Sequence, residues 1–331
     1  TMIIVNSFDK LNNSDIKIFT LKNQNLEVSV LNLGGIIQSF KVNGNDIVLG
    51  FNFANDYLKY DIYSGAVIGR VANIINNSTF TLNNETYTLK SNAGKHCNHS
   101  GISGFDKVIF SHKIDGEKLI LTHFSPDNDG GFPGNMNFSV EYSLEGNALT
   151  VKFTAISDKT TPFAPTLHPY FNLDKKGNIY DTMLKINGNN FTPVNENGVP
   201  TGEVFSAFNT PFDFTDFKAI GKDIFKDNLE LKRANGYDIN YLTSSEHKCT
   251  AKTPGLTIDI YSDMPCLQLY TANDLNGEVG KNGSIYTKHS AFCLEPQFAP
   301  NAVNQNNFTS PIINANTKVT HYIKYQVKNK T

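Results

Sequence analysis

Residues 138 to 153 read Phe138-Ser139-Val140-Glu141-Tyr142-Ser143-Leu144, then Glu145-Gly146-Asn147, then Ala148-Leu149-Thr150-Val151-Lys152-Phe153. Apolar and polar side chains alternate on both sides of a short break, which is the pattern of strands that bury one face. Gly146 and Asn147 are residue types that accept the positive backbone angles of a tight turn. This stretch therefore predicts an antiparallel hairpin.

The same pattern recurs along the chain. Alternating runs at 79–82 and 86–89 flank a turn that contains Asn83 and Asn84, which predicts a second hairpin. Further alternating runs lie at 26–30, 119–124, 256–261 and 322–327, whereas helical periodicity never extends beyond a turn or two. Turn-rich stretches at 127–134 and 193–202 lack the length of an interdomain linker. We expect an all-β protein whose residues 2–331 form a single domain.

Charge and cysteine content narrow the functional classes. The 331 residues carry 29 Lys plus Arg against 31 Asp plus Glu, a formal charge of -2. This balance offers no basic field for nucleic acid and no polybasic patch for a membrane surface. The four cysteines form no CxxC pair, and the first thirty residues lack a signal-peptide pattern. No apolar run approaches the roughly 20 residues of a membrane span, so we expect a cytoplasmic protein with reduced thiols.

Three side chains occupy positions suited to chemistry. His99 lies in a glycine-containing loop, where a side chain can be presented to a ligand. His168 is followed by a proline and two aromatic residues, which would fix the backbone beside it. Glu295 follows an apolar run and precedes Pro296, so it should be partly buried, and burial raises a carboxyl pKa toward the range of a general base. Each residue could equally have a structural role. His96 could pair with His99, but only Cys97 offers a third ligand nearby, and we expect no metal site.

Five segments resemble, in the same order, the aldose 1-epimerase (galactose mutarotase) family. They are residues 65–73 with Arg70, the His99 loop with the Gly-Phe-Asp-Lys signature at 104–107, the His168 segment, residues 236–238 with Asp238, and residues 293–297 with Glu295 followed by 300–304. The last segment is the most specific, and the resemblance runs from the first strands to the last.

This resemblance implies a large antiparallel β-sandwich of the galactose mutarotase-like supersandwich type. It also implies a cofactor-free isomerase that interconverts the α and β anomers of aldohexoses such as galactose or glucose. By resemblance, Glu295 is the general base, His168 the general acid and His99 a hydrogen-bonding partner of the ring oxygen. Arg70 and Asp238 would bind the sugar hydroxyls, and Tyr270 would offer an aromatic face, although it could also be a core tyrosine.

The sequence departs from the family pattern at several positions. Ser100 replaces the first glycine of a His-Gly-Gly loop, Ile74 replaces a frequent arginine, and Asn301 replaces an aspartate. Leu167 and Pro169 flank His168, and Ile239 follows Asp238, where other residues are common. We expect the neighbours of His168 and Asp238 to shape the pocket, which leaves the preferred sugar open.

Three other functions remain open from the sequence. The same scaffold could host a non-catalytic carbohydrate-binding protein, because one fold supports many functions. A glycoside hydrolase needs two carboxylates around one bond, for which Asp238 and Glu295 would be the candidates. A hexose-phosphate epimerase would need a cluster of Arg and Lys around the phosphate, and near these motifs only Arg70 is a strong candidate.

Overall fold

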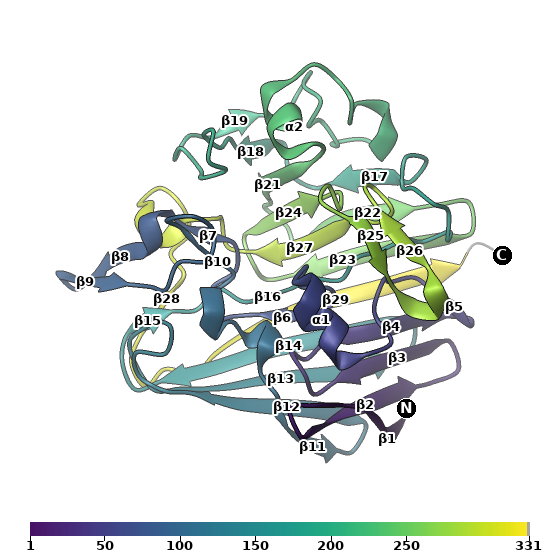
Figure 1. Ribbon diagram of the computed structural model, residues 1–331. Coiled ribbons are helices and arrows are strands. Elements are labelled where there is room, and N and C mark those ends of the chain that lie inside the picture. The colour runs from purple at the N-terminus through teal and green to yellow at the C-terminus, as the bar shows by residue number, and fades with distance from the viewer. Residues whose placement is uncertain (330–331) are drawn as a thin grey trace.

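The computed structural model describes residues 1–329, and antiparallel strands dominate it (Figure 1). Both hairpins predicted from the sequence are present. The first consists of β8 (Thr79–Leu82) and β9 (Glu85–Thr88), and the second of β13 (Met136–Glu145) and β14 (Ala148–Ser157). Gly146 takes a φ of +55° at the second turn. The prediction of an all-β fold is confirmed.

A nine-stranded antiparallel sheet runs through the whole molecule. Its strands follow the order β11 (Ser111–Asp115), β12 (Lys118–Ser125), β13, β14, β29 (Val319–Asn329), β23 (Leu256–Ser262), β22 (His247–Lys252), β17 (Met183–Ile186) and β20 (Lys218–Ala219). β29 comes last in the chain but pairs with both β14 and β23. It therefore joins the strands of the first half of the chain to those of the second half in one sheet.

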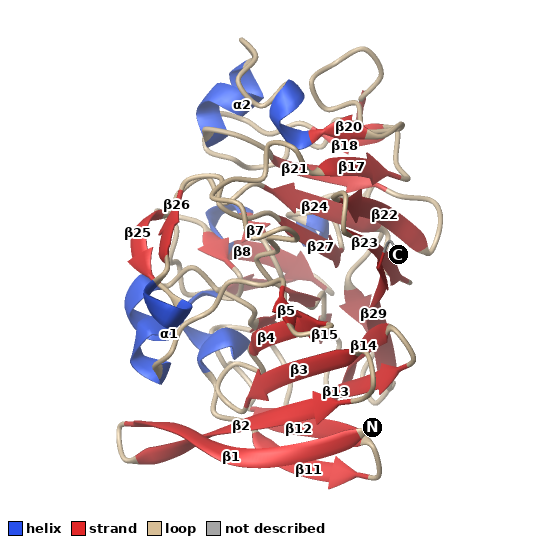
Figure 2. Ribbon diagram, turned by 90° about the vertical axis from the view of Figure 1, so that its right-hand side faces the viewer, coloured by secondary structure: helices blue, strands red, loops and turns tan. Residues whose placement is uncertain are grey.

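A five-stranded sheet packs against the first half of this large sheet (Figure 2). It contains β1 (Met2–Leu11), β2 (Ser14–Lys22), β3 (Leu26–Leu31), β4 (Ile37–Val42) and β5 (Asn45–Asp46) in chain order. In β13 every second residue is buried, and Phe40 of β4 meets Tyr325 of β29 at a ring-centroid distance of 6.4 Å. Burial of these large apolar side chains between the two sheets is the main source of stability in a sandwich.

A second five-stranded sheet lies beside the strands of the second half. Its order is β19 (Phe205–Ser206), β18 (Asn190–Thr192), β21 (Asp238–Leu242), β24 (Cys266–Tyr270) and β27 (Cys293–Gln297). Four further two-stranded ribbons are β6 (Val67–Ile68) with β16 (Thr166–Leu167), β7 (Ile74–Ile75) with β10 (Cys97–Asn98), β15 (Thr161–Pro162) with β28 (Ile312–Ile313), and β25 (Asn276–Val279) with β26 (Ile285–Thr287). β16 also lies against β27, so the ribbon of β6 and β16 reaches this sheet.

Helices are short and peripheral. In the described part of the chain the two α-helices are α1 (Ala54–Tyr60) and α2 (Leu229–Ala234), and single 3-10 turns occur at Asn76–Ser78, Gly101–Ser103, Phe105–Lys107, Ile220–Lys222, Lys281–Gly283 and Ala302–Asn304. Within residues 1–329, no helix has the length and apolar character needed to cross a membrane.

Candidate active site

A cavity of about 270 Å³ beside the second five-stranded sheet collects most of the candidate residues. Its walls include His99, His168, Asp238, Tyr270 and Glu295, which are far apart in the sequence. Hollows of about 340 and 590 Å³ elsewhere on the protein contain none of them. The fold therefore brings five of the six candidate side chains to one place.

Strand register places the carboxylates on one face of the sheet. Asp238 of β21 lies opposite Tyr270 of β24, and Gln268 of β24 lies opposite Glu295 of β27. Gln268 and Tyr270 are two residues apart, so both side chains project from the same face. The side-chain amide of Gln268 donates to Asp238 Oδ1 at 2.7 Å, while Oε2 of Glu295 and Oε1 of Gln268 are buried without a hydrogen-bond partner. The sheet thus presents free acceptors to the cavity.

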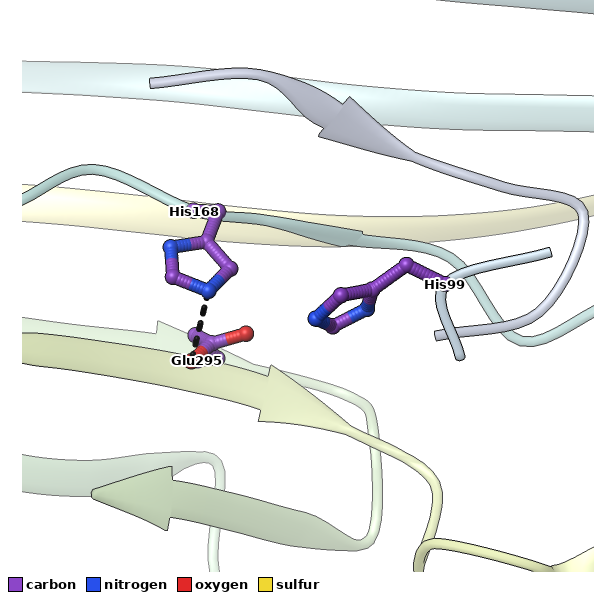
Figure 3. A group of neighbouring side chains, drawn as sticks. All are labelled: His99, His168 and Glu295. Carbon is purple, nitrogen blue, oxygen red and sulfur yellow. Dashed lines mark ion pairs between the residues drawn. The ribbon is translucent and has the colours of Figure 1, made fainter. Parts of the chain in front are cut away.

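His168 approaches this face from the neighbouring ribbon. It follows β16, where its N–H donates to Ala66 O at 3.0 Å and its carbonyl accepts from the N–H of Gly65 at 2.8 Å. Its Nε2 lies 3.6 Å from Glu295 Oε1, as the dashed line in Figure 3 marks. This separation suits a shared proton once a ligand draws the two groups together.

His99 reaches Glu295 from a different segment than His168 (Figure 3). Its ring Nδ1 accepts a hydrogen bond from the backbone N–H of Asn73 at 3.0 Å, and its own N–H donates to the carbonyl of Asn73 at 3.1 Å. Because Nδ1 is an acceptor here, a neutral imidazole carries its proton on Nε2. His99 is therefore held as a hydrogen-bond donor toward the cavity.

Burial dominates the electrostatics of these groups. It raises the pKa of the Glu295 carboxyl well above its usual range, and the charge of Asp238 raises it further. Burial lowers the pKa of His168 to about 4. Burial also lowers the pKa of His99, and repulsion from the neighbouring His168 lowers it further. Burial also raises the pKa of Asp238. Burial therefore shifts Glu295 and the two histidines toward their neutral forms, and the Glu295–His168 pair holds one transferable proton.

The same three residues have the composition of a metal site. His99, His168 and Glu295 each offer a ligand atom, and these atoms lie within 4.8 Å of one another. Two imidazoles and a carboxylate bind zinc in many proteins. However, the N–H of Asn73 occupies Nδ1 of His99, which leaves the proton on Nε2 and blocks that atom as a ligand. The arrangement favours proton transfer over metal binding.

Arg70 does not line the cavity, which corrects the expectation that it binds sugar. Its side chain is buried, and the guanidinium donates to the carbonyls of Pro133 at 2.9 Å, Gly134 at 2.8 Å and Ser125 at 3.0 Å. It also donates to the carbonyl of Pro126 at 3.2 Å and to the Ser125 hydroxyl at 3.0 Å. These acceptors converge on the guanidinium because the 125–134 loop folds over it.

Other cavity residues were missed as candidates by sequence reasoning. They are Asp61, Ile62, Tyr63, Asn73, Asn98, Tyr170, Gln268 and Asp274. The position of Gln268, two residues before Tyr270 on a strand, was a usable signal because side chains alternate. The carboxylate of Asp274 accepts from the Tyr270 hydroxyl at 3.0 Å, which fixes that ring at the cavity wall. Asp61 and Tyr63 lie in a loop without a recognisable pattern.

Two of the departures from the family pattern also prove structural. Leu167 and Ile239 are core residues with 0% and 2% exposure, and neither lines the cavity, contrary to the expectation that they shape it. Ser100 has a φ of +67°, where glycine would be the usual residue, and its hydroxyl accepts from the N–H of Val71 and donates to the carbonyl of Val71. These bonds anchor the His99 loop to the segment between β6 and Asn73.

Comparisons with known proteins agree with this geometry. The family model for aldose 1-epimerase matches residues 17–326. A galactose mutarotase from Sus scrofa is 37% identical over 317 residues, covering 92% of this chain and 91% of that protein. An aldose 1-epimerase from Escherichia coli is 30% identical over 312 residues, covering 89% and 90%. The crystal structure of a galactose 1-epimerase from Lactobacillus acidophilus superposes with a TM-score of 0.90 at 26% identity, covering 100% of this chain and 99% of that one.

The match spans nearly every strand described above, and it includes the segments that carry Glu295, His168 and His99. The β-sandwich expected from the resemblance is confirmed by the shared fold. On these grounds the chain belongs to the aldose 1-epimerase family.

Proposed function

We propose that the protein interconverts the α and β anomers of free aldohexoses such as galactose or glucose by acid-base ring opening and closure, without a cofactor. The observation that carries this proposal is the meeting of Glu295, His168 and His99 within 4.8 Å at the wall of one cavity. At about 270 Å³ the cavity is smaller than the range of roughly 300–1,000 Å³ typical of drug-sized ligands, so its size suits a monosaccharide.

Glu295 acts as the base in the opening step. Its carboxylate takes the proton of the anomeric hydroxyl while the bond between the anomeric carbon and the ring oxygen breaks, and His168 delivers a proton to that oxygen. The product is an open-chain aldehyde. Rotation about the bond next to the aldehyde exposes its other face, and the same proton transfers in reverse close the ring to the other anomer. No atom or electron is exchanged with a second substrate.

The charge state needed for this step differs from the one that burial favours. Opening requires an ionised Glu295 and a protonated His168. This state differs from the neutral pair only in that the shared proton has moved from the Glu295 carboxyl to the His168 ring. Sugar hydroxyls that donate to the carboxylate stabilise its anionic form. Sugar binding is therefore expected to shift the proton toward His168 and to prepare the pair for reaction.

The remaining residues orient the sugar. His99 donates from Nε2 toward the ring oxygen and stabilises charge that develops there. Asp238 accepts from a hydroxyl, since Gln268 occupies only its Oδ1. Tyr270 offers an apolar ring face at the cavity wall. Holding the reacting atoms in place in this way contributes to catalysis by lowering the entropic cost of the transition state.

The cavity disfavours the phosphosugar alternative. Four carboxylate residues line it, namely Asp61, Asp238, Asp274 and Glu295, and within the described residues no Lys or Arg does so. A phosphate group would meet acceptors rather than the cationic donors that it needs. The glycoside hydrolase alternative is disfavoured because Asp238 and Glu295 project from the same face of one sheet rather than flanking a bond.

The test is polarimetry of freshly dissolved α-galactose, and separately α-glucose, with the wild type and Glu295→Gln. We expect the wild type to accelerate decay to the same final rotation, and Glu295→Gln to lose that acceleration by about 10²–10⁴-fold. Glu117→Gln, on the exposed surface, is the matched control and should behave as wild type. Calorimetric sugar binding by Glu295→Gln separates a catalytic defect from unfolding. Near-normal turnover in Glu295→Gln would remove Glu295 from the mechanism. If the wild type binds sugar but does not accelerate the decay of the rotation, the result would support the non-catalytic carbohydrate-binding alternative.

Two broader proposals accompany this function. We propose that residues 2–331 work as a single domain, of which residues 330 and 331 lie outside the described part of the chain, because one core cluster draws residues from all three large sheets. We also propose a cytoplasmic location, supported by four cysteines that are all free and buried.

A further inference from the structure

Lys107 lies next to the cavity but is not part of its wall. It ends the 3-10 turn Phe105–Lys107, and its Nζ lies 2.9 Å from Asp61 Oδ1 and 3.5 Å from Asp106 Oδ2. Burial alone would lower the pKa of Lys107, but the charges of Asp106 and Asp61 raise it overall. A charged ammonium thus links the turn that contains Asp106 to the segment that contains Asp61.

The segment 61–63 is strained and forms part of the cavity wall. Asp61 has a φ of +50° and Tyr63 a φ of +58°, a region that residues with side chains seldom adopt. Asp61 and Tyr63 both line the cavity. A segment with two such residues needs contacts that hold it in place, and the ion pair with Lys107 is one of them.

Tyr63 connects this segment to the histidines. Its ring centroid lies 4.6 Å from that of His99 and 6.1 Å from that of His168. The Nζ of Lys107 lies 5.7 Å from the centroid of the same tyrosine ring, within the range of a cation–π interaction. Lys107 therefore contacts both ends of the segment, Asp61 through charge and Tyr63 through its ring.

We propose that Lys107 is a positioning residue for the acid-base reaction: it holds the segment 61–63 so that Tyr63 packs against His99 and completes the cavity wall. This inference rests on the proposed function. Without the ammonium, Asp61 and the buried Asp106 lose their shared counterion, and the strained segment can relax away from the histidines. Sugar would then meet a wider cavity and a His99 ring that is less well oriented.

The kinetic test compares Lys107→Met and Lys107→Arg with the wild type. We expect Lys107→Met to raise KM and lower kcat, with kcat/KM reduced about tenfold or more, because small displacements of catalytic groups have large effects. Lys107→Arg keeps the charge and should recover most of this loss. Lys113→Met removes an exposed ion pair with Asp115 on β11 and is the matched control. A lower melting temperature with unchanged KM and kcat in Lys107→Met would indicate a purely structural residue and overturn the proposal.

A spectroscopic readout does not depend on turnover. In protein labelled with ¹⁵N-histidine, the ring signals of His99, assigned by their loss in His99→Asn, report the packing of Tyr63 through its ring current. We expect these signals to move in Lys107→Met and to stay in place in Lys113→Met. Unchanged His99 signals in folded Lys107→Met would refute the positioning role. If the His99 signals shift as expected in Lys107→Met but the wild type does not accelerate mutarotation, the result would count against the proposed function and not against the positioning role.

Discussion

Arg70→Met separates a sugar-binding arginine from a structural one. The guanidinium makes five hydrogen bonds of 3.2 Å or less, four of them to the carbonyls of Ser125, Pro126, Pro133 and Gly134. Methionine fills much of the same space but donates to none of these carbonyls, so each loses this donor, although the carbonyl of Pro126 keeps the N–H of Asp129 at 3.0 Å. A buried acceptor left without a donor costs about 1–3 kcal/mol, so the loss of several of these bonds together should cost about 3–5 kcal/mol. With an unfolding entropy near 2.1 cal/mol/K per residue, this corresponds to a melting temperature lower by about 4–7 °C.

The assay combines denaturant unfolding with sugar kinetics on the folded protein. We expect Arg70→Met to unfold at lower denaturant concentration while its KM for galactose stays close to the wild-type value. Arg70→Lys keeps the charge but has only three donors, so its stability should lie between the two. The opposite pattern, unchanged stability with a large rise in KM, would show that Arg70 contacts the sugar and that the burial argument is wrong.

Two further predictions concern Asp238 and the Glu295–His168 pair. Asp238→Asn should raise KM by about 10-fold or more without loss of stability, since a hydrogen bond to a charged group is worth about 1.5–3 kcal/mol. Calorimetric sugar binding and thermal unfolding check this prediction. An unchanged affinity would exclude a contact between Asp238 and the sugar. The Glu295–His168 pair is active while it holds one proton, so kcat/KM falls at low pH when a second proton binds. That proton binds His168, whose burial lowers its pKa, so the acid limb should lie below the ordinary histidine pKa of about 6.5. The alkaline limb should lie well above pH 4.5, because the burial of Glu295 raises its pKa. An acid limb at or above pH 7 would contradict the assignment of that limb to His168, and an alkaline limb near pH 4.5 would contradict the assignment of the other limb to Glu295.

The strands were predictable because their signal is local. The run 138–153 alternates over its whole length, and β13 and β14 form there because an antiparallel pair with one buried face satisfies that pattern. The candidate site was predictable only as residue types. That Glu295 meets Gln268 depends on the pairing of β24 with β27, which no local pattern encodes. Resemblance supplied Asp238 and Tyr270, but it also suggested Arg70 as a sugar ligand, because the sequence does not reveal that the carbonyls of a loop more than fifty residues away surround it.

The candidate groups owe their positions to the backbone more than to neighbouring side chains. His99 is bound through both its ring and its N–H to the main chain of Asn73, and His168 through its N–H and carbonyl to residues 65 and 66. Glu295 is fixed by strand pairing. Side chains such as Leu167 and Ile239 can therefore differ from the family pattern, provided that they still fill the core, without moving the reacting atoms. The segment 61–63 lacks such pairing with a strand, and side chains hold it: the Tyr170 hydroxyl donates to the carbonyl of Ile62 at 2.9 Å, and Lys107 contacts Asp61 and Tyr63. It is therefore the part of the cavity wall where side-chain contacts should decide how well the site is formed.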